Sequence, residues 1–264
     1  MAYRQWQNLT TTDFDALDQG AAVAVLPIAA TEQHGPHLPV GTDAMIAAGM
    51  LEALAGQLGD EPDILVMPVL SVGASLEHEA FAGTLSVPSA GLADQIVALA
   101  GGVRAAGTSK LVIVSSHGGN IAAMTDAALR CRAGMSMLAV NLTWARLGLP
   151  DGLVGDDERA FGVHGGFVET SLMLHFRPDL VRMDHARAFG SLQERLAGDC
   201  DLLRAYGADM EYHEDSDDYG FAKGLEYTAI YGDVAPLDRL GRTRNSIVIT
   251  SAYNPVGAAM PTIS

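Results

Sequence analysis

Short apolar runs alternate with longer segments of helical periodicity along most of the chain. An uncharged run of about four to eight residues between turn formers is typical of a buried strand, whereas apolar residues at helical spacing indicate an amphipathic helix. The alternation predicts an α/β fold with a mostly parallel central sheet. We expect strands at residues 23–30, 64–70, 110–115 and 137–142, and helices at 43–58, 89–106, 121–133 and 191–206, with one more helix ending near residue 176.

Two segments lack this pattern. Residues 148–159 are acidic and Gly-rich, which predicts a loop, and residues 211–218 are acidic enough to predict a solvated surface loop. The sequence contains no internal repeat, low-complexity tract or linker that would divide it. We therefore expect one domain over residues 1–264.

The chain is strongly acidic. Its formal net charge is −16 over 264 residues, of which 48% are hydrophobic, so it can bury one large core. Nucleic-acid binding depends on Lys and Arg neutralising phosphates, and the charge argues against it. An acidic surface instead favours solubility and divalent cations.

Cysteine usage and the N-terminus predict a cellular location. Cys131 and Cys200 form neither a disulfide framework nor a CxxC pair, as expected in a reducing cytoplasm. The segment Met1–Trp6 lacks the apolar core of a signal peptide, and no uncharged run reaches the roughly 20 residues that span a bilayer. We expect a cytoplasmic protein without a membrane partner.

The densest group of metal-type side chains follows the first predicted strand. Glu32, His34, His37 and Asp43 lie within twelve residues, at the strand end where open α/β sheets bind ligands. Glu32 and His34 are two residues apart, so in an extended segment their side chains leave on the same face. We expect Asp43 to cap the helix that follows and Gly59 to end it.

More such residues follow later strands and helices. His117 follows the strand at 110–115, and His164 and Glu169 lie at the mouth of the helix that ends near residue 176. Buried imidazoles and carboxylates are costly unless they are paired or bind a cation, so this pattern predicts a metal site at one sheet edge. With Asp43 able to bridge, the set fits two divalent cations, with Zn²⁺ the first choice and Mn²⁺ or Fe²⁺ the alternatives. Such a pair predicts hydrolysis of an amide-like C–N bond.

Other candidate residues have simpler explanations. We expect His37 and His78 to be hydrogen-bonded structural residues by default, and we assign no chemistry to His175, His185 or His213. Gly118 and Gly119 fit a tight turn that also lets the backbone approach the site closely. Trp144 fits either the core or a pocket wall.

The motifs together resemble the creatininase (creatinine amidohydrolase) family. The hallmark segment runs from Leu26 through Asp43, and three further segments match in order over residues 20–176. These are Glu77-His78 with Gly83-Thr84-Leu85-Ser86, then His117-Gly118-Gly119-Asn120, then His164 with Glu169-Thr170-Ser171.

The resemblance implies a role for each matched residue. Glu32, Asp43 and His117 would hold one metal ion, and His34 would hold the second with Asp43 as the bridge. Creatininase itself has a Glu where this chain has Gly119. The family branch with His-Gly-Gly-Asn lacks this ligand, so Glu169 is the expected replacement. His164 would transfer protons. Substrate contacts are expected from Glu77, His78 and Trp144.

The resemblance also implies a three-layer α/β/α sandwich assembled as a homohexamer. The leading functional hypothesis is a metal-dependent amidohydrolase that cleaves a small cyclic amide or formamide through a hydroxide held by two divalent metals. The alternatives are a metallopeptidase of the mycofactocin-precursor type, a formamidopyrimidine nucleotide deformylase, and a binding protein without turnover. The expected partners are a small-molecule amide substrate and further copies of the chain.

Overall fold

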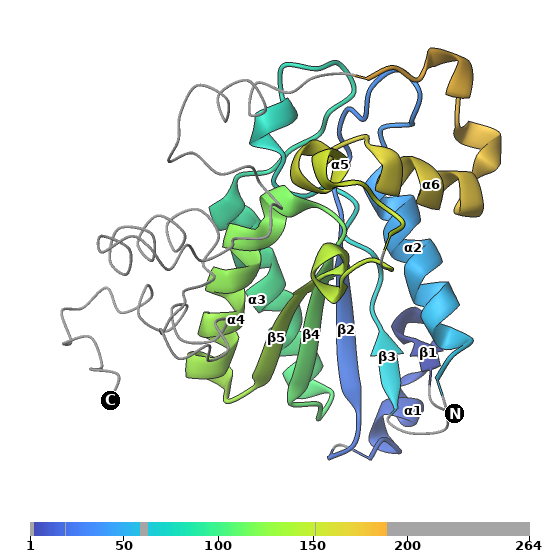
Figure 1. The fold of residues 1–264 in the computed structure, drawn as a ribbon. Helices are drawn as coiled ribbons and strands as arrows, with labels where there is room; N and C mark the ends of the chain where they lie inside the picture. Colours follow the sequence, from blue (N-terminus) through green and yellow to red (C-terminus); the bar gives the residue numbers. More distant parts are fainter. Residues whose placement is uncertain (1–2, 19, 59–62, 151, 189–264) are drawn as a thin grey trace, which may run out of the picture. The chain divides into compact units, whose positions relative to one another are not determined.

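In the computed structural model, which describes residues 3–188 apart from 19, 59–62 and 151, five parallel strands form one sheet (Figure 1). All four pairings between neighbouring strands are parallel. The predicted α/β fold with a parallel sheet is therefore confirmed. The strands are β1 (Tyr3–Gln5), β2 (Val23–Ile28), β3 (Ile64–Val66), β4 (Lys110–Ser115) and β5 (Leu138–Thr143), in the order β1-β3-β2-β4-β5.

The strand order places β2 at the centre of the sheet. The chain adds β3 on one side of β2 and then crosses over to add β4 on the other side. Ligands bind at such a reversal, beyond the carboxyl ends of the strands. The segments that follow β2 and β4 therefore lie side by side at this edge, because Ile28 pairs with Ser115 at the ends of the two strands.

Helices cover both faces of the sheet and form the three predicted layers (Figure 1). On one face, α3 (Ser89–Ala105) contacts α4 (Ile121–Met135), and on the other, α2 (Thr42–Ala55) contacts α6 (Phe167–Phe176). Two short helices, α1 (Thr11–Asp15) and α5 (Asp156–Phe161), complete the α-helices described. The 3₁₀ helices are Trp6–Asn8, Leu76–His78, Gly118–Asn120, Trp144–Leu147, Pro178–Leu180 and Met183–His185.

Alternating residues of β2 reach the two layers. Leu26 and Ile28 belong to the large core cluster beneath α3 and α4, whereas Val25 packs with Leu51 of α2 in a smaller cluster. Successive side chains of a strand point to opposite faces, so an uninterrupted apolar run suits a strand covered on both sides. This explains why β2 carries no charged residue.

Three expectations about element ends were wrong. The helix expected at 43–58, with Gly59 as its stop, ends at Ala55, and Gly56 is its C-cap. The strand expected at 64–70 ends at Val66, and Pro68, which has no N–H to donate, interrupts it before Leu70 resumes contact with Ile28 through an isolated bridge. Asp43 is not the cap of α2, because the helix begins at Thr42 after Gly41. Asp43 lies inside the first turn.

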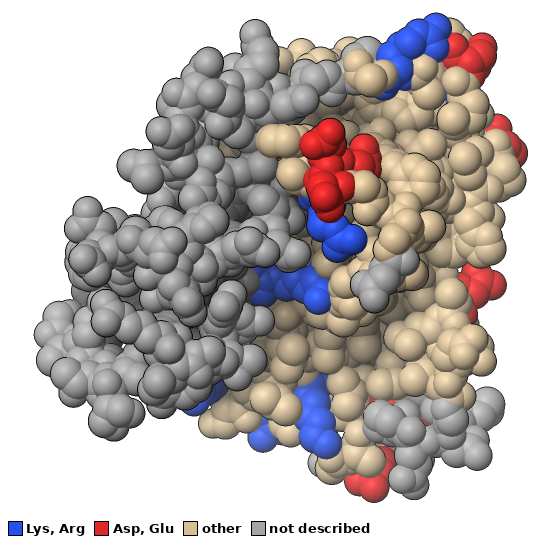
Figure 2. All heavy atoms as spheres, in the orientation of Figure 1, with Lys and Arg blue, Asp and Glu red and all other residues tan. Residues whose placement is uncertain are grey.

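The region expected to be a loop at 148–159 contains the start of α5. Gly155 precedes the helix, and Asp156, Asp157 and Glu158 occupy its first turn, where negative charge is stabilised by the helix dipole. This acidic group stands out over α5 on the face shown in Figure 2. The helix was missed because its side chains form no apolar stripe.

Several predictions fall outside the described residues. They are the helix at 191–206, the acidic loop at 211–218, and the expectations for Cys200 and His213. The single domain over 1–264 stays a prediction. Within the described part of the chain, no helix has the length and apolar character needed to cross a membrane.

Candidate metal centre

Three parts of the fold bring carboxylates and imidazoles together beyond the carboxyl ends of β2 and β4. The segment after β2 carries Glu32 and His34, α2 carries Asp43 in its first turn, and His117 follows β4. These four residues are buried, with at most 6% of any of them exposed. His164 and Glu169 reach the same place from the segment before α6 and from its first turn.

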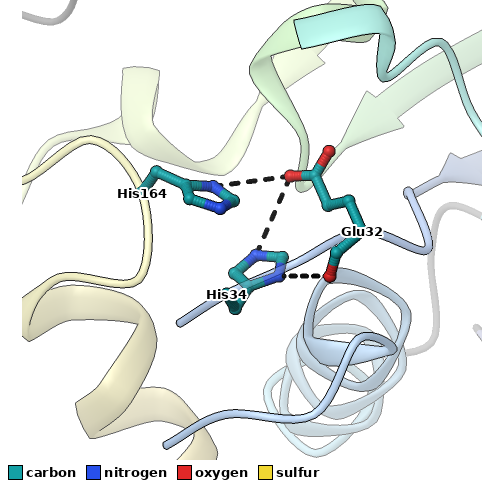
Figure 3. A group of neighbouring side chains, drawn as sticks. All are labelled: Glu32, His34 and His164. Carbon is teal, nitrogen blue, oxygen red and sulfur yellow. Dashed lines mark hydrogen bonds and ion pairs between the residues drawn. The ribbon is translucent and has the colours of Figure 1, made fainter. Parts of the chain in front are cut away.

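One oxygen of Glu32 forms the middle of the group. Glu32 Oε1 lies 3.1 Å from His117 Nδ1 and 3.4 Å from His164 Nδ1, and it is 3.8 Å from His78 Nε2 and 3.9 Å from His34 Nε2. Figure 3 shows the rings of His34 and His164 beside this carboxylate. Four imidazole nitrogens thus face one carboxylate oxygen. The other oxygen, Oε2, accepts a hydrogen bond from the Ser75 hydroxyl.

Backbone carbonyls fix three of these rings. His34 Nδ1 lies 3.1 Å from Glu32 O and His117 Nε2 lies 3.0 Å from Ala74 O, while His164 Nε2 bonds to Gln33 O. Carbonyls only accept hydrogen bonds, so in each ring this nitrogen carries the proton. When such a ring is neutral, as it must be to bind a metal ion, its second nitrogen therefore presents a lone pair on the side of the carboxylates. Metal-binding histidines are commonly oriented in this way.

Asp43 lies between two of the imidazoles. Its Oδ1 is 3.3 Å from His34 Nε2, and its Oδ2 is 3.7 Å from His117 Nδ1. Glu169 Oε1 lies 3.7 Å from the same His34 nitrogen, while Glu169 Oε2 accepts a 2.5 Å hydrogen bond from Gly165 N. Asp43 therefore offers one oxygen to each side of the site.

Several polar atoms at the centre have no hydrogen-bond partner within the described part of the protein. They are Glu32 Oε1, His34 Nε2 and both carboxylate oxygens of Asp43, and all are buried. Leaving such atoms unsatisfied is costly, and a bound cation would satisfy them together. This donor set of imidazole and carboxylate groups fits a divalent transition metal ion.

The pKa shifts of the buried residues in the absence of a metal also indicate a site for a cation. Burial disfavours a charged ring, but Asp43 and Glu169 outweigh it and raise the pKa of His34 to about 11. Burial is likewise outweighed at His117, where Glu32 and Glu77 raise the pKa to about 10. Burial would raise the pKa of Glu32, yet His117 and Ser75 lower it to about 2. The carboxylates thus attract positive charge strongly.

At Asp43 and His164, burial affects the pKa more than the neighbouring charges do. It raises the pKa of Asp43 to about 6 despite the neighbouring His34. It also lowers the pKa of His164, as does His34. His164 is therefore a neutral imidazole near pH 7, and its Nδ1 can accept a proton.

Three sets of ligand atoms within the described residues are close enough to hold an ion. They are Glu32 with His34 and His164; Glu32 with Glu77 and His117; and His34 with Asp43 and Glu169. All five residues predicted as metal ligands belong to at least one set. The predicted proton-transfer residue His164 and the predicted substrate contact Glu77 also belong to one each.

The other residues considered from sequence have these positions. His37 is buried and lies 3.0 Å from the Thr170 hydroxyl, while His78 stacks on His164 with ring centroids 4.1 Å apart. Trp144 packs against the small core cluster beneath α2. His175 and His185 are both exposed and lie outside these metal-ligand sets.

Sequence reasoning found Glu77 and His78 in the loop after β3 but missed Ala74 and Ser75 of the same loop, as well as Gln33. Ala74 and Ser75 bind His117 and Glu32, as described above, and Gln33 binds both His78 and His164. The position of the loop directly after a predicted strand was the available signal. The small side chains of Ala74 and Ser75 gave no further indication.

Comparison with known proteins agrees with this geometry. A family model described as "Creatininase: Creatinine amidohydrolase" matches residues 7–229. The chain belongs to the creatininase family. This confirms the resemblance found in the motifs.

The chain is similar in sequence and in fold to individual members of the creatininase family. A mycofactocin precursor peptide peptidase from Mycolicibacterium smegmatis is 34% identical over 178 residues, 67% of this chain and 66% of the relative. Creatinine amidohydrolase from Pseudomonas putida is 30% identical over 197 residues, 67% of this chain and 73% of the relative. A solved creatininase mutant described as Zn–Zn type has a TM-score of 0.57 at 28% identity, covering 70% of this chain and 77% of the other. The chain spans just under two thirds of the length of the peptidase.

Proposed function

We propose that this creatininase-family protein is a metal-dependent hydrolase of an amide C–N bond, and that its substrate is a peptide. The observation that carries the hydrolytic part is the buried group around Glu32 Oε1, where four imidazole nitrogens face one carboxylate oxygen. Buried ionisable groups in such number are typical of a functional site. Their type is that of hydrolytic metal sites.

The residues suit two divalent cations. Glu32, Asp43 and His117 would hold one, and His34, Asp43 and Glu169 would hold the other, with Zn²⁺ as the first choice and Mn²⁺ or Fe²⁺ as alternatives. The two oxygens of Asp43, which face His34 and His117 separately, support its role as the bridge. When bound, such cations polarise a carbonyl group and make water more acidic.

The choice of a peptide substrate rests on similarity. The M. smegmatis relative, named a mycofactocin precursor peptide peptidase, is 34% identical, whereas creatinine amidohydrolase is 30% identical. The chemistry at the scissile bond is that of an amide in both cases, so the same donor groups serve either substrate. A cyclic amide such as creatinine is the second candidate because the family model also carries that description.

His164 is placed to move protons. Its Nε2 donates to Gln33 O, and its Nδ1 faces Glu32 at the centre of the group. A neutral imidazole in this orientation can accept a proton at Nδ1 from attacking water and return it to the leaving nitrogen. His78, stacked against it, restricts the ring to this orientation.

A substrate panel tests the proposal. The purified protein is stripped of metal, reloaded separately with Zn²⁺, Mn²⁺ or Fe²⁺, and incubated with short peptides, creatinine and a formamide. We expect metal-dependent release of a terminal fragment from peptides and little turnover of creatinine. Turnover of creatinine alone would favour the second candidate. Two bound ions without any hydrolysis would indicate a binding protein.

We also propose that the protein is a cytoplasmic homo-oligomer, with the homohexamer implied by the resemblance as the specific form. This proposal rests on the sequence alone. Sedimentation equilibrium of the full chain tests it, since a hexamer of 27.7 kDa subunits differs greatly in mass from a monomer. A monomeric mass at micromolar concentration would contradict it.

A further inference from the structure

The loop that follows β3 contacts the buried group at several points. Ser75 donates to Glu32 Oε2, and Ala74 O accepts from His117 Nε2. Glu77, in the 3₁₀ helix Leu76–His78, places its Oε1 3.3 Å from that same His117 nitrogen. The loop is itself held in place, because Ala74 N donates to Asn120 Oδ1 over 2.9 Å.

The two nitrogens of the His117 ring face different partners. Its Nδ1 side faces Glu32 and Asp43, at 3.1 and 3.7 Å, and its Nε2 side faces Ala74 O and Glu77. The Nε2 proton used by Ala74 O cannot coexist with a metal bond at the same nitrogen. His117 therefore has only Nδ1 available for a cation, and Glu77 Oε1 lies beside the other ring nitrogen.

The glycine at position 119 gives Glu77 its space. A Cβ at Gly119 would lie 2.5 Å from Glu77 Oε1, 2.4 Å from His117 Nε2 and 2.5 Å from Ala74 O. Real Cβ atoms essentially never approach other atoms so closely. Any side chain at 119 would therefore displace the Glu77 carboxylate, the ring or the loop backbone.

We propose that Glu77 is a positioning residue, which with Ala74 O holds His117 with its proton on Nε2 and its lone pair at Nδ1 directed toward the cation bound by Glu32 and Asp43. The negative charge of Glu77 also makes the ring a stronger ligand. Carboxylates behind metal-binding histidines act in this way, and their loss typically costs about 10- to 100-fold in metal affinity. This inference rests on the proposed function and assigns Glu77 a role other than substrate contact.

The charge of Glu77 can be removed with little change in shape. Glu77→Gln keeps an oxygen that can accept from Nε2, and Glu79→Gln removes a charge from an exposed residue of the same loop as a matched control. Zn²⁺ affinity and stoichiometry are measured by competition with a chromophoric chelator. We expect Glu77→Gln to keep the wild-type stoichiometry but to weaken one ion about 10-fold, at the lower end of the range because the Glu77 side chain is 47% exposed. Glu79→Gln should match the wild type.

Two further measurements examine the ring and the glycine. ¹⁵N NMR of His117 in the Zn²⁺-loaded protein should show a proton on Nε2. Gly119→Ala, with its fold checked by circular dichroism, should weaken the same ion more than Glu77→Gln does, because the ring itself must move.

The possible outcomes distinguish a failure of the role given to Glu77 from a failure of the proposed metal-dependent function. Equal Zn²⁺ affinity in wild type and Glu77→Gln, or a proton on Nδ1 of His117, would overturn this inference alone. Loss of one whole ion in Glu77→Gln would also overturn it, because Glu77 would then be a direct ligand. Wild-type protein that takes up no Zn²⁺ would overturn the proposed function itself.

Discussion

His34 Nε2 lies 3.3 Å from Asp43 Oδ1, and both side chains are almost completely buried. The two residues are joined by a turn that contains Gly35, which adopts a positive φ of 70°. His34 belongs to the segment after β2, and Asp43 belongs to the first turn of α2. One short connection thus supplies donors from two different elements.

Asp43→Ala should abolish metal binding and hydrolysis together. The substitution removes the one side chain among the described residues that offers one oxygen to His34 and another to His117. Metal content is measured by elemental analysis, and the helical circular dichroism should stay unchanged. Glu52→Ala, at an exposed position of the same helix, is the matched control and should keep its metal. Full hydrolysis by Asp43→Ala after chelation would refute the site.

Metal uptake should release protons. With the pKa of His34 near 11 and that of His117 near 10 in the absence of metal, both rings carry two protons at pH 7. A ring must lose one of them to bind a cation, so we expect about two protons released per subunit and tighter binding as the pH rises. Isothermal titration calorimetry in buffers of different ionisation enthalpy measures this number. Identical binding enthalpies in all buffers would contradict it.

His164→Asn should lower turnover and leave the metal in place. Removal of a general acid or base typically reduces the rate by about 10²- to 10⁴-fold. The kcat is measured with the best substrate from the panel, beside the metal content of the same sample. Loss of an ion would instead make His164 a ligand, as the set with Glu32 and His34 would allow.

Asn120→Ala should destabilise the fold. The buried Asn120 side chain accepts from Ala74 N and donates to Ala29 O, over 2.9 and 3.1 Å. Its removal leaves two buried backbone groups without hydrogen-bond partners, and each such group costs about 1–3 kcal/mol. We therefore expect the free energy of unfolding to fall by an amount on the order of 3 kcal/mol. Urea unfolding gives the free energy of unfolding. Asn8→Ala, at an exposed position, should change it by less than about 0.5 kcal/mol.

The core of the fold could be predicted from local pattern. The strand at Lys110–Ser115 and the helix that starts at Ser89 begin where the apolar periodicity begins, because burial on a sheet or under a helix face imposes that periodicity. The strand Tyr3–Gln5 was missed because three residues are too few to show a pattern. It pairs with β3, a contact between distant parts of the chain that no local signal encodes.

The site was predictable where the chemistry lies in the side chain. Glu32, His34 and Asp43 share one segment, and their residue types alone suggested a cation. The contributions of Ala74 and Gln33 could not be predicted because they use backbone carbonyls, which every residue possesses. The proximity of Glu77 to Gly119 likewise depends on a contact across the sheet edge.

The place of Glu169 in α6 has a consequence for biosynthesis. During translation, β2, α2 and β4 leave the ribosome well before α6 does. A nascent chain that ends before α6 therefore contains the other acidic and imidazole donors but lacks Glu169 and the helix that packs on α2. A product that is terminated before α6 would have a proposed metal site that lacks one of its ligands.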